Sequence, residues 1–211
     1  MNRPLFTLRA AMRLFFSHRS PWLLILILAA LLIGRVFDST PLSSSECLIA
    51  LSASLYWPFQ EWWMHRWLLH LKPYQLFGRR IEPSFARLHR LHHEDPKDIP
   101  LSFLPTSTIF GALVGFSGLV YWLSGSQALT LSWMSAATGS TLLYEWVHFL
   151  THTDYRPRGR YYRAIWKLHR WHHYKNEAYW FSFTVPWIDR LFGTGPDPKE
   201  VPKSPTVQKL S

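Results

Sequence analysis

Ten of the eleven histidines in this chain of 211 residues fall into four short clusters. Along the chain, these clusters have the spacings H-x4-H, H-x2-H-H, H-x3-H and H-x2-H-H. Their members are His65 and His70; His89, His92 and His93; His148 and His152; and His169, His172 and His173. The second and fourth clusters are near-copies, and a Glu-Trp pair precedes both the first and the third. The sequence therefore contains two related halves, each ending in H-x2-H-H.

This clustering predicts metal binding. Imidazole is the commonest metal ligand among side chains, and helix positions i, i+3 and i+4 share one face. Each H-x2-H-H cluster, and the His148–His152 pair, is therefore predicted to present its histidines on one side of a helix. His65 and His70 are five residues apart, or about 140° around an ideal helix, so this pair requires an irregular turn or two different targets. We predict two metal ions, because ten ligands exceed one coordination sphere.

The composition narrows the class of site and of protein. The single cysteine, Cys47, excludes an internal disulfide framework and a thiolate metal cage. Aromatic residues make up 17% of the chain, a share typical of proteins with rings at a membrane boundary. The net charge of +10 could indicate nucleic-acid binding, but no recognition motif accompanies it. Membrane topology explains the charge better.

Four apolar segments alternate with basic stretches. The expected helices cover about residues 21–37, 47–63, 101–123 and 127–146. Of the 23 lysines and arginines, all except Arg35 lie before residue 21, within 64–100, or after 147. Basic loops face the cytoplasm, so both termini and all ten clustered histidines are predicted to be cytoplasmic, at the endoplasmic reticulum or a bacterial inner membrane.

The expected fold is all-α and integral to the membrane, with four transmembrane helices and a cytoplasmic helical cap. Residues 1–20 form a basic N-terminal stretch, which is too long for a cleaved signal peptide and lacks a small-x-small site. Residues 21–195 form a single membrane domain, whose cap consists of 64–100 and 147–195. The tail 196–211, rich in proline and lysine, is expected to be flexible.

The chemistry of the ligands favours a redox enzyme. Imidazole suits iron, zinc, copper and nickel, whereas a hydrolytic zinc site usually has about three protein ligands and an open position. Two adjacent redox ions would instead suit oxygen activation and attack on an unactivated C–H bond. Glu61 and Glu145 each lie about one helical turn before a clustered histidine, so each is expected to accept a hydrogen bond from an imidazole. Asp154, Tyr144 and Tyr174 are further candidates beside the ligands.

The order of the four clusters between paired hydrophobic helices resembles the fatty acid hydroxylase superfamily of membrane di-metal oxygenases, over about residues 45–195. Residues 92–98, 144–152, 172–176 and 186–194 resemble the fatty acid 2-hydroxylase branch most. The resemblance implies that the ten histidines bind two iron ions, which zinc can replace in a recombinant sample, and that O2 hydroxylates a lipid acyl chain. It also implies a separate electron donor, similar to cytochrome b5 or a ferredoxin, since the sequence has no His-Pro-Gly-Gly haem motif.

Two alternatives stay open. A desaturase, or a sterol or carotenoid oxidase, would share the same di-iron core, and the sequence does not separate it from a hydroxylase. A non-catalytic membrane metal-binding or transport protein is disfavoured, because transporters place polar ligands near the membrane midplane and the apolar segments here contain almost none.

Overall fold

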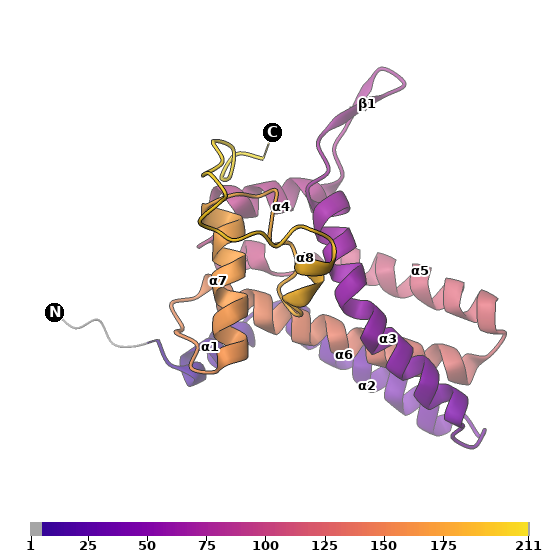
Figure 1. Cartoon of the computed structure of the whole chain (residues 1–211). Coiled ribbons are helices and arrows are strands. Elements are labelled where there is room, and N and C mark those ends of the chain that lie inside the picture. The colour runs from indigo at the N-terminus through magenta and orange to yellow at the C-terminus, as the bar shows by residue number, and fades with distance from the viewer. Residues whose placement is uncertain (1–5, 211) are drawn as a thin grey trace. The chain divides into compact units, whose positions relative to one another are not determined.

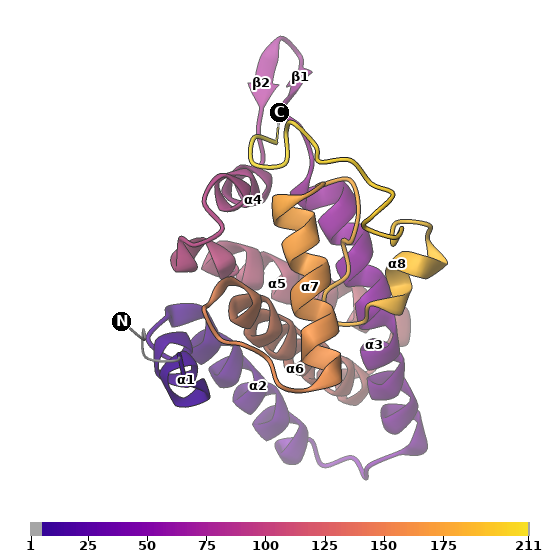
Figure 2. The same cartoon turned by 60° about the vertical axis from the view of Figure 1, so that its left-hand side comes forward.

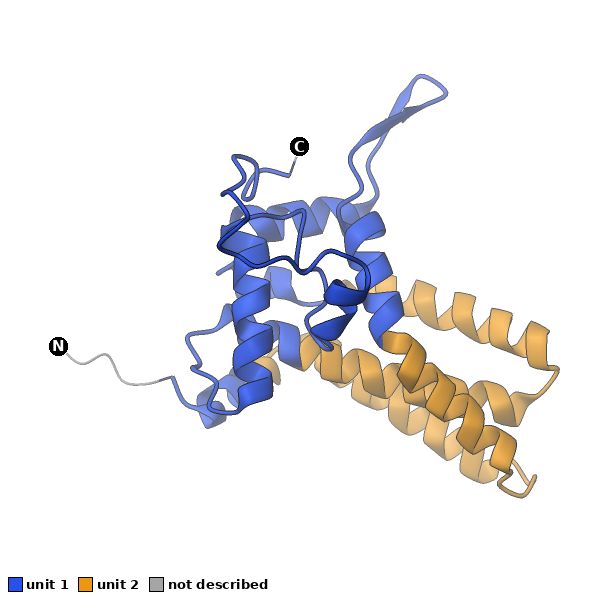
Figure 3. Cartoon of the chain, in the orientation of Figure 1, with its two compact units in different colours: residues 1–14, 58–103, 147–211 blue, residues 15–57, 104–146 orange. Residues whose placement is uncertain are grey.

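The computed structural model describes residues 6–210, which are mainly helical, with one two-stranded hairpin (Figure 1). The elements are α1 (Leu8–Phe15), α2 (Arg19–Phe37), α3 (Ser44–Trp63), the π-helix η1 (Met64–Leu69), β1 (Tyr74–Leu76), β2 (Arg79–Ile81), α4 (Ser84–Glu94), the 3-10 helix η2 (Ile99–Ser102), α5 (Thr106–Ser124), α6 (Gln127–His152), α7 (Arg160–Tyr174) and α8 (Trp187–Leu191). They form two compact units, coloured in Figure 3. Unit 1 contains residues up to Leu14, 58–103 and those from Val147 onward, and unit 2 contains 15–57 and 104–146.

Each of the four expected apolar segments is helical. The helix expected from residue 101 begins instead at Thr106, because Pro100 and Pro105 disfavour helix before them and Leu101 lies in the 3-10 helix η2. By length and composition, two segments within residues 6–210 are apolar enough to cross a membrane, Arg19–Phe37 and Ile99–Ser124. Their mean hydropathies are 2.1 and 1.6, and few of their side chains are buried.

Buried carboxylates connect the helices of unit 2. Glu46, at the start of α3, accepts a hydrogen bond from the guanidinium Nη2 of Arg35 on α2 (2.8 Å) and from Ser132 Oγ on α6 (2.8 Å). Glu145 on α6 accepts hydrogen bonds at Oε1 from Ser20 Oγ (2.6 Å) and the Leu104 backbone N–H (2.9 Å). Because buried carboxylates are costly unless they are paired, these contacts fix α6 against α2 and α3.

Unit 1 is built around α4, α7 and the end of α3 with η1. In both Figure 1 and Figure 2 the C-terminal end of α7 lies beside α4. A small core of Trp62, Phe181 and Ile188 connects the end of α3 with α8 and the chain before it. The hairpin β1–β2 turns through Phe77 (φ 49°) and Gly78 (φ 72°), and two positive φ angles are the mark of a type I′ turn.

The end of the chain also packs on unit 1. Residues 196–210 form no helix or strand, yet Val201 and Val207 are buried. The Ser204 backbone N–H donates to the Lys175 carbonyl at 2.7 Å. The structure thus holds part of the tail, for which the composition suggested flexibility, against the end of α7.

Candidate metal centre

The structure brings all ten clustered histidines into unit 1, in two groups of five. The first group is His65, His70, His89, His93 and His172, and the second group is His92, His148, His152, His169 and His173. Within each group, one ring nitrogen from every residue lies within 4.8 Å of the others. Two nitrogens on opposite sides of one ion, at bonds of about 2.1 Å, would be about 4.2 Å apart. The spacing of each group is therefore close to that of a filled coordination sphere.

The two H-x2-H-H clusters are divided between the groups in mirror fashion. From α4, His89 and His93 join the first group and His92 the second. From α7, His172, at position i+3, joins the first group, whereas His169 and His173 join the second. Each cluster was expected to present its three histidines together, and the structure instead directs the i+3 member to the other group.

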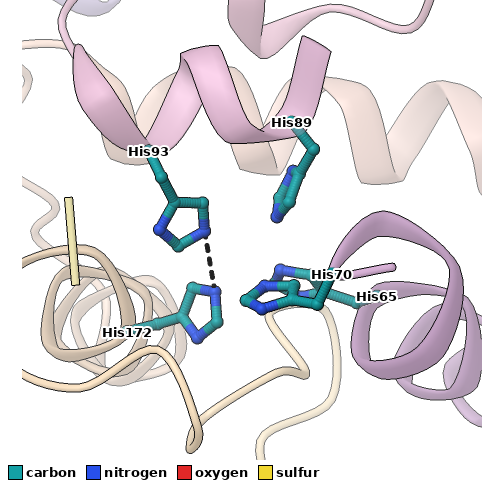
Figure 4. Close-up of side chains that lie close together, drawn as sticks. All are labelled: His65, His70, His89, His93 and His172. Atoms are coloured by element: carbon teal, nitrogen blue, oxygen red, sulfur yellow. Dashed lines mark hydrogen bonds between the residues drawn. The ribbon is translucent and has the colours of Figure 1, made fainter. Parts of the chain in front are cut away.

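Figure 4 shows the first group, with His89 and His93 projecting from α4 toward His65, His70 and His172. The Nε2 atoms of His93 and His172 are 3.2 Å apart. The irregular turn required by the five-residue spacing of His65 and His70 is the π-helix η1, whose i→i+5 hydrogen bonds bring residues five apart near one another. Their ring centroids are 5.1 Å apart, so the pair serves one target.

The second group converges on one atom, Nε2 of His152. The Nε2 atoms of His92 and His148 each lie 3.1 Å from it, and Nε2 of His169 lies 2.8 Å from it. A neutral ring nitrogen either donates one proton or accepts one, so hydrogen bonding satisfies at most one of these three approaches well. A cation among the nitrogens would relieve the repulsion between their lone pairs.

Backbone carbonyls determine which nitrogen of each ring faces the group. Nδ1 of four histidines lies within hydrogen-bond distance of a carbonyl oxygen: His65 with Phe181 (2.5 Å), His172 with Tyr179 (2.7 Å), His148 with Ser102 (2.9 Å) and His93 with Val207 (3.1 Å). His152 is bonded to the Pro96 backbone. A ring that donates from Nδ1 keeps its lone pair at Nε2, which is the tautomer a metal ligand needs.

The unpaired ring nitrogens test whether metal ions fit. Within the described chain, seven buried nitrogens of the groups have no hydrogen-bond partner: His65 Nε2, His70 Nε2, His89 Nε2, His92 Nδ1, His169 Nδ1, and both Nδ1 and Nε2 of His173. A buried polar atom without a partner costs about 1–3 kcal/mol. So many in one place fit two ions bound by imidazole, and the sequence expectation of ten ligands agrees with the donor set.

Electrostatics keep the rings neutral. Burial lowers the pKa of every histidine in the two groups, to about 3 for His93 and about 4 for His148. Neighbouring imidazoles lower the pKa of His172 and His173 further, because a second positive charge would be close by. Neutral imidazole is the form that binds metal ions.

The expected partners of the ligands lie elsewhere. Glu61 accepts hydrogen bonds from the backbone of Phe183 (2.7 Å) and Thr184 (3.0 Å), and Glu145 accepts those of unit 2 described above. Tyr144 is buried in unit 2 with its ring 6.1 Å from that of Trp57. Asp154 is exposed, and the ring of Tyr174 packs on Arg170. Backbone carbonyls occupy the position beside the imidazoles that the sequence suggested for carboxylates.

Two buried carboxylates hold the segment that supplies two of these carbonyls. Asp189 on α8 accepts from the backbone N–H groups of Phe181 and Ser182, both at 2.9 Å, and from Thr194 Oγ1 at 2.6 Å. Burial raises the pKa of Asp189 to about 6. Glu61 holds the next two residues. These carboxylates thus fix the Phe181 carbonyl that orients His65.

Two phenylalanines of this segment, which the sequence did not single out, pack on the histidines. The Phe183 ring stacks on His148 at 4.9 Å and lies 5.4 Å from His65, so it contacts both groups. The Phe181 ring lies 5.4 Å from both His70 and His172. The only sequence signal for these two residues is that they lie shortly before Pro186, where one of the segments that carried the resemblance begins.

Known proteins are similar to this chain in sequence. The chain is 29% identical over 157 residues to the ceramide very long chain fatty acid hydroxylase SCS7 of Saccharomyces cerevisiae, covering 72% of this chain and 39% of that protein. It is 26% and 28% identical to the dihydroceramide fatty acyl 2-hydroxylases FAH2 and FAH1 of Arabidopsis thaliana, covering 74% and 68% of this chain and 64% and 58% of theirs. The chain therefore spans less than two thirds of the length of these relatives.

A solved structure has the same fold. The structure titled full-length scs7p, in which only the hydroxylase domain is visible, superposes with a TM-score of 0.72 at 22% identity, covering 88% of this chain and 68% of that one. The family model for fatty acid hydroxylases matches residues 50–194, which include all ten histidines of the two groups. This chain belongs to the fatty acid hydroxylase family.

Proposed function

We propose that this protein is a membrane-bound di-iron monooxygenase that hydroxylates a lipid acyl chain with O2 and external electrons. The observation that carries the proposal is the pair of adjacent five-histidine groups, neutral and mostly buried, in which several ring nitrogens have no hydrogen-bond partner. The rings of His93 and His173, from different groups, are 4.2 Å apart, so two ions would be neighbours. The names of the relatives suggest a fatty acyl group of a ceramide or dihydroceramide as the substrate, with position 2 as the reacting carbon.

Two bound iron ions would supply reductive activation of O2. The protein's own residues hold the ions, with the first group of histidines on one and the second group on the other. The carbonyls of Phe181, Tyr179, Ser102 and Val207 keep Nε2 of their histidines unprotonated. The rings of Phe181 and Phe183 exclude water from the histidines, which protects an oxidising site from side reactions.

An electron donor needs a docking surface, and α7 offers one. Arg163, Lys167 and Arg170 follow the spacing i, i+4, i+7 and are exposed, on the side of α7 turned away from its three histidines. A basic stripe attracts an acidic partner and accelerates its association. We infer that an acidic redox protein, of the cytochrome b5 or ferredoxin kind, docks there, on the helix that also carries His169 and His173 of the second group.

The reaction is tested by lipid mass spectrometry of cells that express the protein under ordinary or isotopically heavy O2. The expected product carries one additional oxygen atom, which comes from O2, and a chain with His172→Ala and His148→Ala yields none. A product that has instead lost two hydrogens identifies a desaturase. An oxygen from water, or no new lipid despite two bound ions, contradicts the proposal.

We also infer that α2, α3, α5 and α6 each cross the membrane, that the spanning part of α6 ends at about residue 146, before His148, and that the histidines and both ends of the chain are cytoplasmic. The basic residues support this orientation, since only Arg35 lies toward the other side. The single cysteine, Cys47, is exposed near the expected outer turn, so a membrane-impermeant maleimide should label it from the non-cytoplasmic side. The matched control, Cys47→Ser with Lys199→Cys, should be labelled only after the membrane is opened.

A further inference from the structure

The chain after α8 returns to the metal centre. Residues 201–207, hereafter the return segment, lie beyond the region matched by the family model, which ends at residue 194. The segment has no regular secondary structure, and its composition gave no reason to expect a role. Its two ends, Val201 and Val207, are nevertheless buried, with 7% and 4% of their surface exposed. Burial at both ends indicates that the segment is packed in place.

Three residues directly after α7 hold the return segment. The Lys175 carbonyl accepts from the Ser204 backbone N–H at 2.7 Å, and the Asn176 side-chain amide donates to the Pro202 carbonyl at 3.3 Å. Glu177 Oε1 accepts from Ser204 Oγ at 2.9 Å and from Thr206 Oγ1 at 2.5 Å. The segment is therefore tied to the chain that immediately follows His173, and the Glu177 carboxylate is the side chain with most contacts to it.

This anchoring positions one carbonyl at the first group. The Val207 carbonyl oxygen lies 3.1 Å from His93 Nδ1, and Nε2 of the same ring lies 3.2 Å from Nε2 of His172. His93 is fully buried, so solvent does not replace this acceptor. Other histidines also have a backbone carbonyl oxygen beside Nδ1, but those carbonyls belong to Phe181, Tyr179 and Ser102, within the region that the family model matches.

We propose that the return segment is a working part of the metal centre: Glu177 holds it so that the Val207 carbonyl fixes His93 with Nε2 unprotonated, and this sets the metal affinity of the first group. The inference rests on the proposed binding of two ions. In the second group, His148 and His152 are bonded instead to the backbone of Ser102 and Pro96, outside the segment. Loss of an acceptor beside a metal-bound histidine typically weakens metal binding about 10–100-fold, so that change is expected at one ion of the two.

The test measures Zn²⁺ binding by the purified full chain in detergent, titrated against a competing chelator, with metal content per chain as a second readout. A side-chain change cannot remove a backbone carbonyl, so the anchors are changed instead. The Ser204→Ala/Thr206→Val double variant removes both hydroxyls at nearly constant size, and the control Thr206→Ser keeps both. Glu177→Ala removes the acceptor, whereas Glu177→Gln retains an oxygen that can accept.

Truncation provides an independent pair of chains. A chain ending after Glu200 lacks the return segment, and a chain ending after Gln208 keeps the Val207 carbonyl. The expected result is that Glu177→Ala, the double variant and the Glu200 truncation weaken one of the two binding steps about 10–100-fold. Thr206→Ser, Glu177→Gln and the Gln208 truncation should bind almost as the intact chain does. His148→Ala, which removes a ligand of the second group, assigns the affected step to the first.

Three results overturn the inference. Equal weakening of both steps indicates general loss of structure, and no weakening indicates that the segment does not act on His93. Weakening of the second group's step alone contradicts the assignment. If the intact chain binds no Zn²⁺, the proposed metal centre itself fails, and this result is separate because it appears before any variant is compared.

Discussion

The division of each H-x2-H-H cluster between the two histidine groups makes a prediction that sequence proximity alone would reverse. His169 and His172 lie within one turn of α7, yet Nε2 of His169 is 2.8 Å from His152 and Nε2 of His172 is 3.2 Å from His93. His89 lies in a different helix from His172 but in the same group. We therefore expect the pair His172→Ala/His169→Ala to weaken the binding of both ions, and His172→Ala/His89→Ala to weaken the binding of only one.

The magnitude follows from linkage. An ion present at about 100 times its dissociation constant stabilises the folded state by about 2.7 kcal/mol. Removing a direct ligand should cost at least the roughly 100-fold of an outer partner, which leaves about 0.4 kcal/mol of that stabilisation. Each single variant thus loses about 2.3 kcal/mol of metal-dependent stability. The pair from different groups should lose about 4.6 kcal/mol, whereas the pair from one group cannot exceed about 2.7 kcal/mol, because the same ion is lost twice.

The assay is denaturant unfolding of the chain in detergent, with and without a chelator, together with metal content per chain. The difference between the two conditions isolates the contribution of the ions, since the cavity left by a deleted imidazole is present in both. The reasoning is refuted if His172→Ala/His169→Ala loses no more metal-dependent stability than one ion supplies, or if His172→Ala/His89→Ala loses more than that.

Three further predictions concern other parts of unit 1. Burial lowers the pKa of His93 from 6.5 in the unfolded chain to about 3 in the folded chain. As the pH falls below 6.5, the unfolded chain therefore binds a proton at this residue and the folded chain does not. His93 should cost the metal-free fold about 3 kcal/mol by pH 4.5, measured as unfolding free energy against pH. Asp189→Asn should cost about 1–3 kcal/mol, because an amide N–H would face a backbone N–H, while the exposed control Asp197→Asn should change little in the same unfolding assay. Charge reversal at Arg163 and Lys167 should slow reduction by an acidic donor at low salt and leave the metal content unchanged, and an undiminished rate would contradict docking on α7.

The sequence predicted that the histidines would meet, because helical periodicity and metal preference act on residues it displays directly. Geometry also required an irregular turn at His65 and His70, and η1 supplies it. The division of each H-x2-H-H cluster between two groups could have been predicted from helical angles, but the expectation was that each cluster would present its histidines together. On a helix, positions i and i+4 differ by about 40°, whereas i+3 lies about 60° to the other side. The i and i+4 members share one group in both clusters, and the i+3 member reaches the other.

Other features of the site have no signature in the sequence. The acceptors beside His65, His93, His148 and His172 are backbone carbonyls, which every residue has, so no residue type marks them. Reasoning from side chains therefore assigned that place to Glu61 and Glu145. In the structure Glu61 instead accepts hydrogen bonds from the backbone N–H groups of Phe183 and Thr184. Local pattern predicted which histidines would gather, and it predicts poorly what long-range packing brings beside them.

The two halves of the sequence are interleaved at the centre in a way that couples metal binding to folding. The first group takes four ligands from the first half and His172 from the second; the second group takes four from the second half and His92 from the first. Neither half alone can therefore complete a group of five, so the binding free energy of each ion contributes to joining the halves. Moreover His92 and His93 are adjacent in the chain but serve different groups, as do His172 and His173. With consecutive Cα atoms about 3.8 Å apart, covalent geometry itself keeps the two groups close, so the two ions of the proposed function would be neighbours.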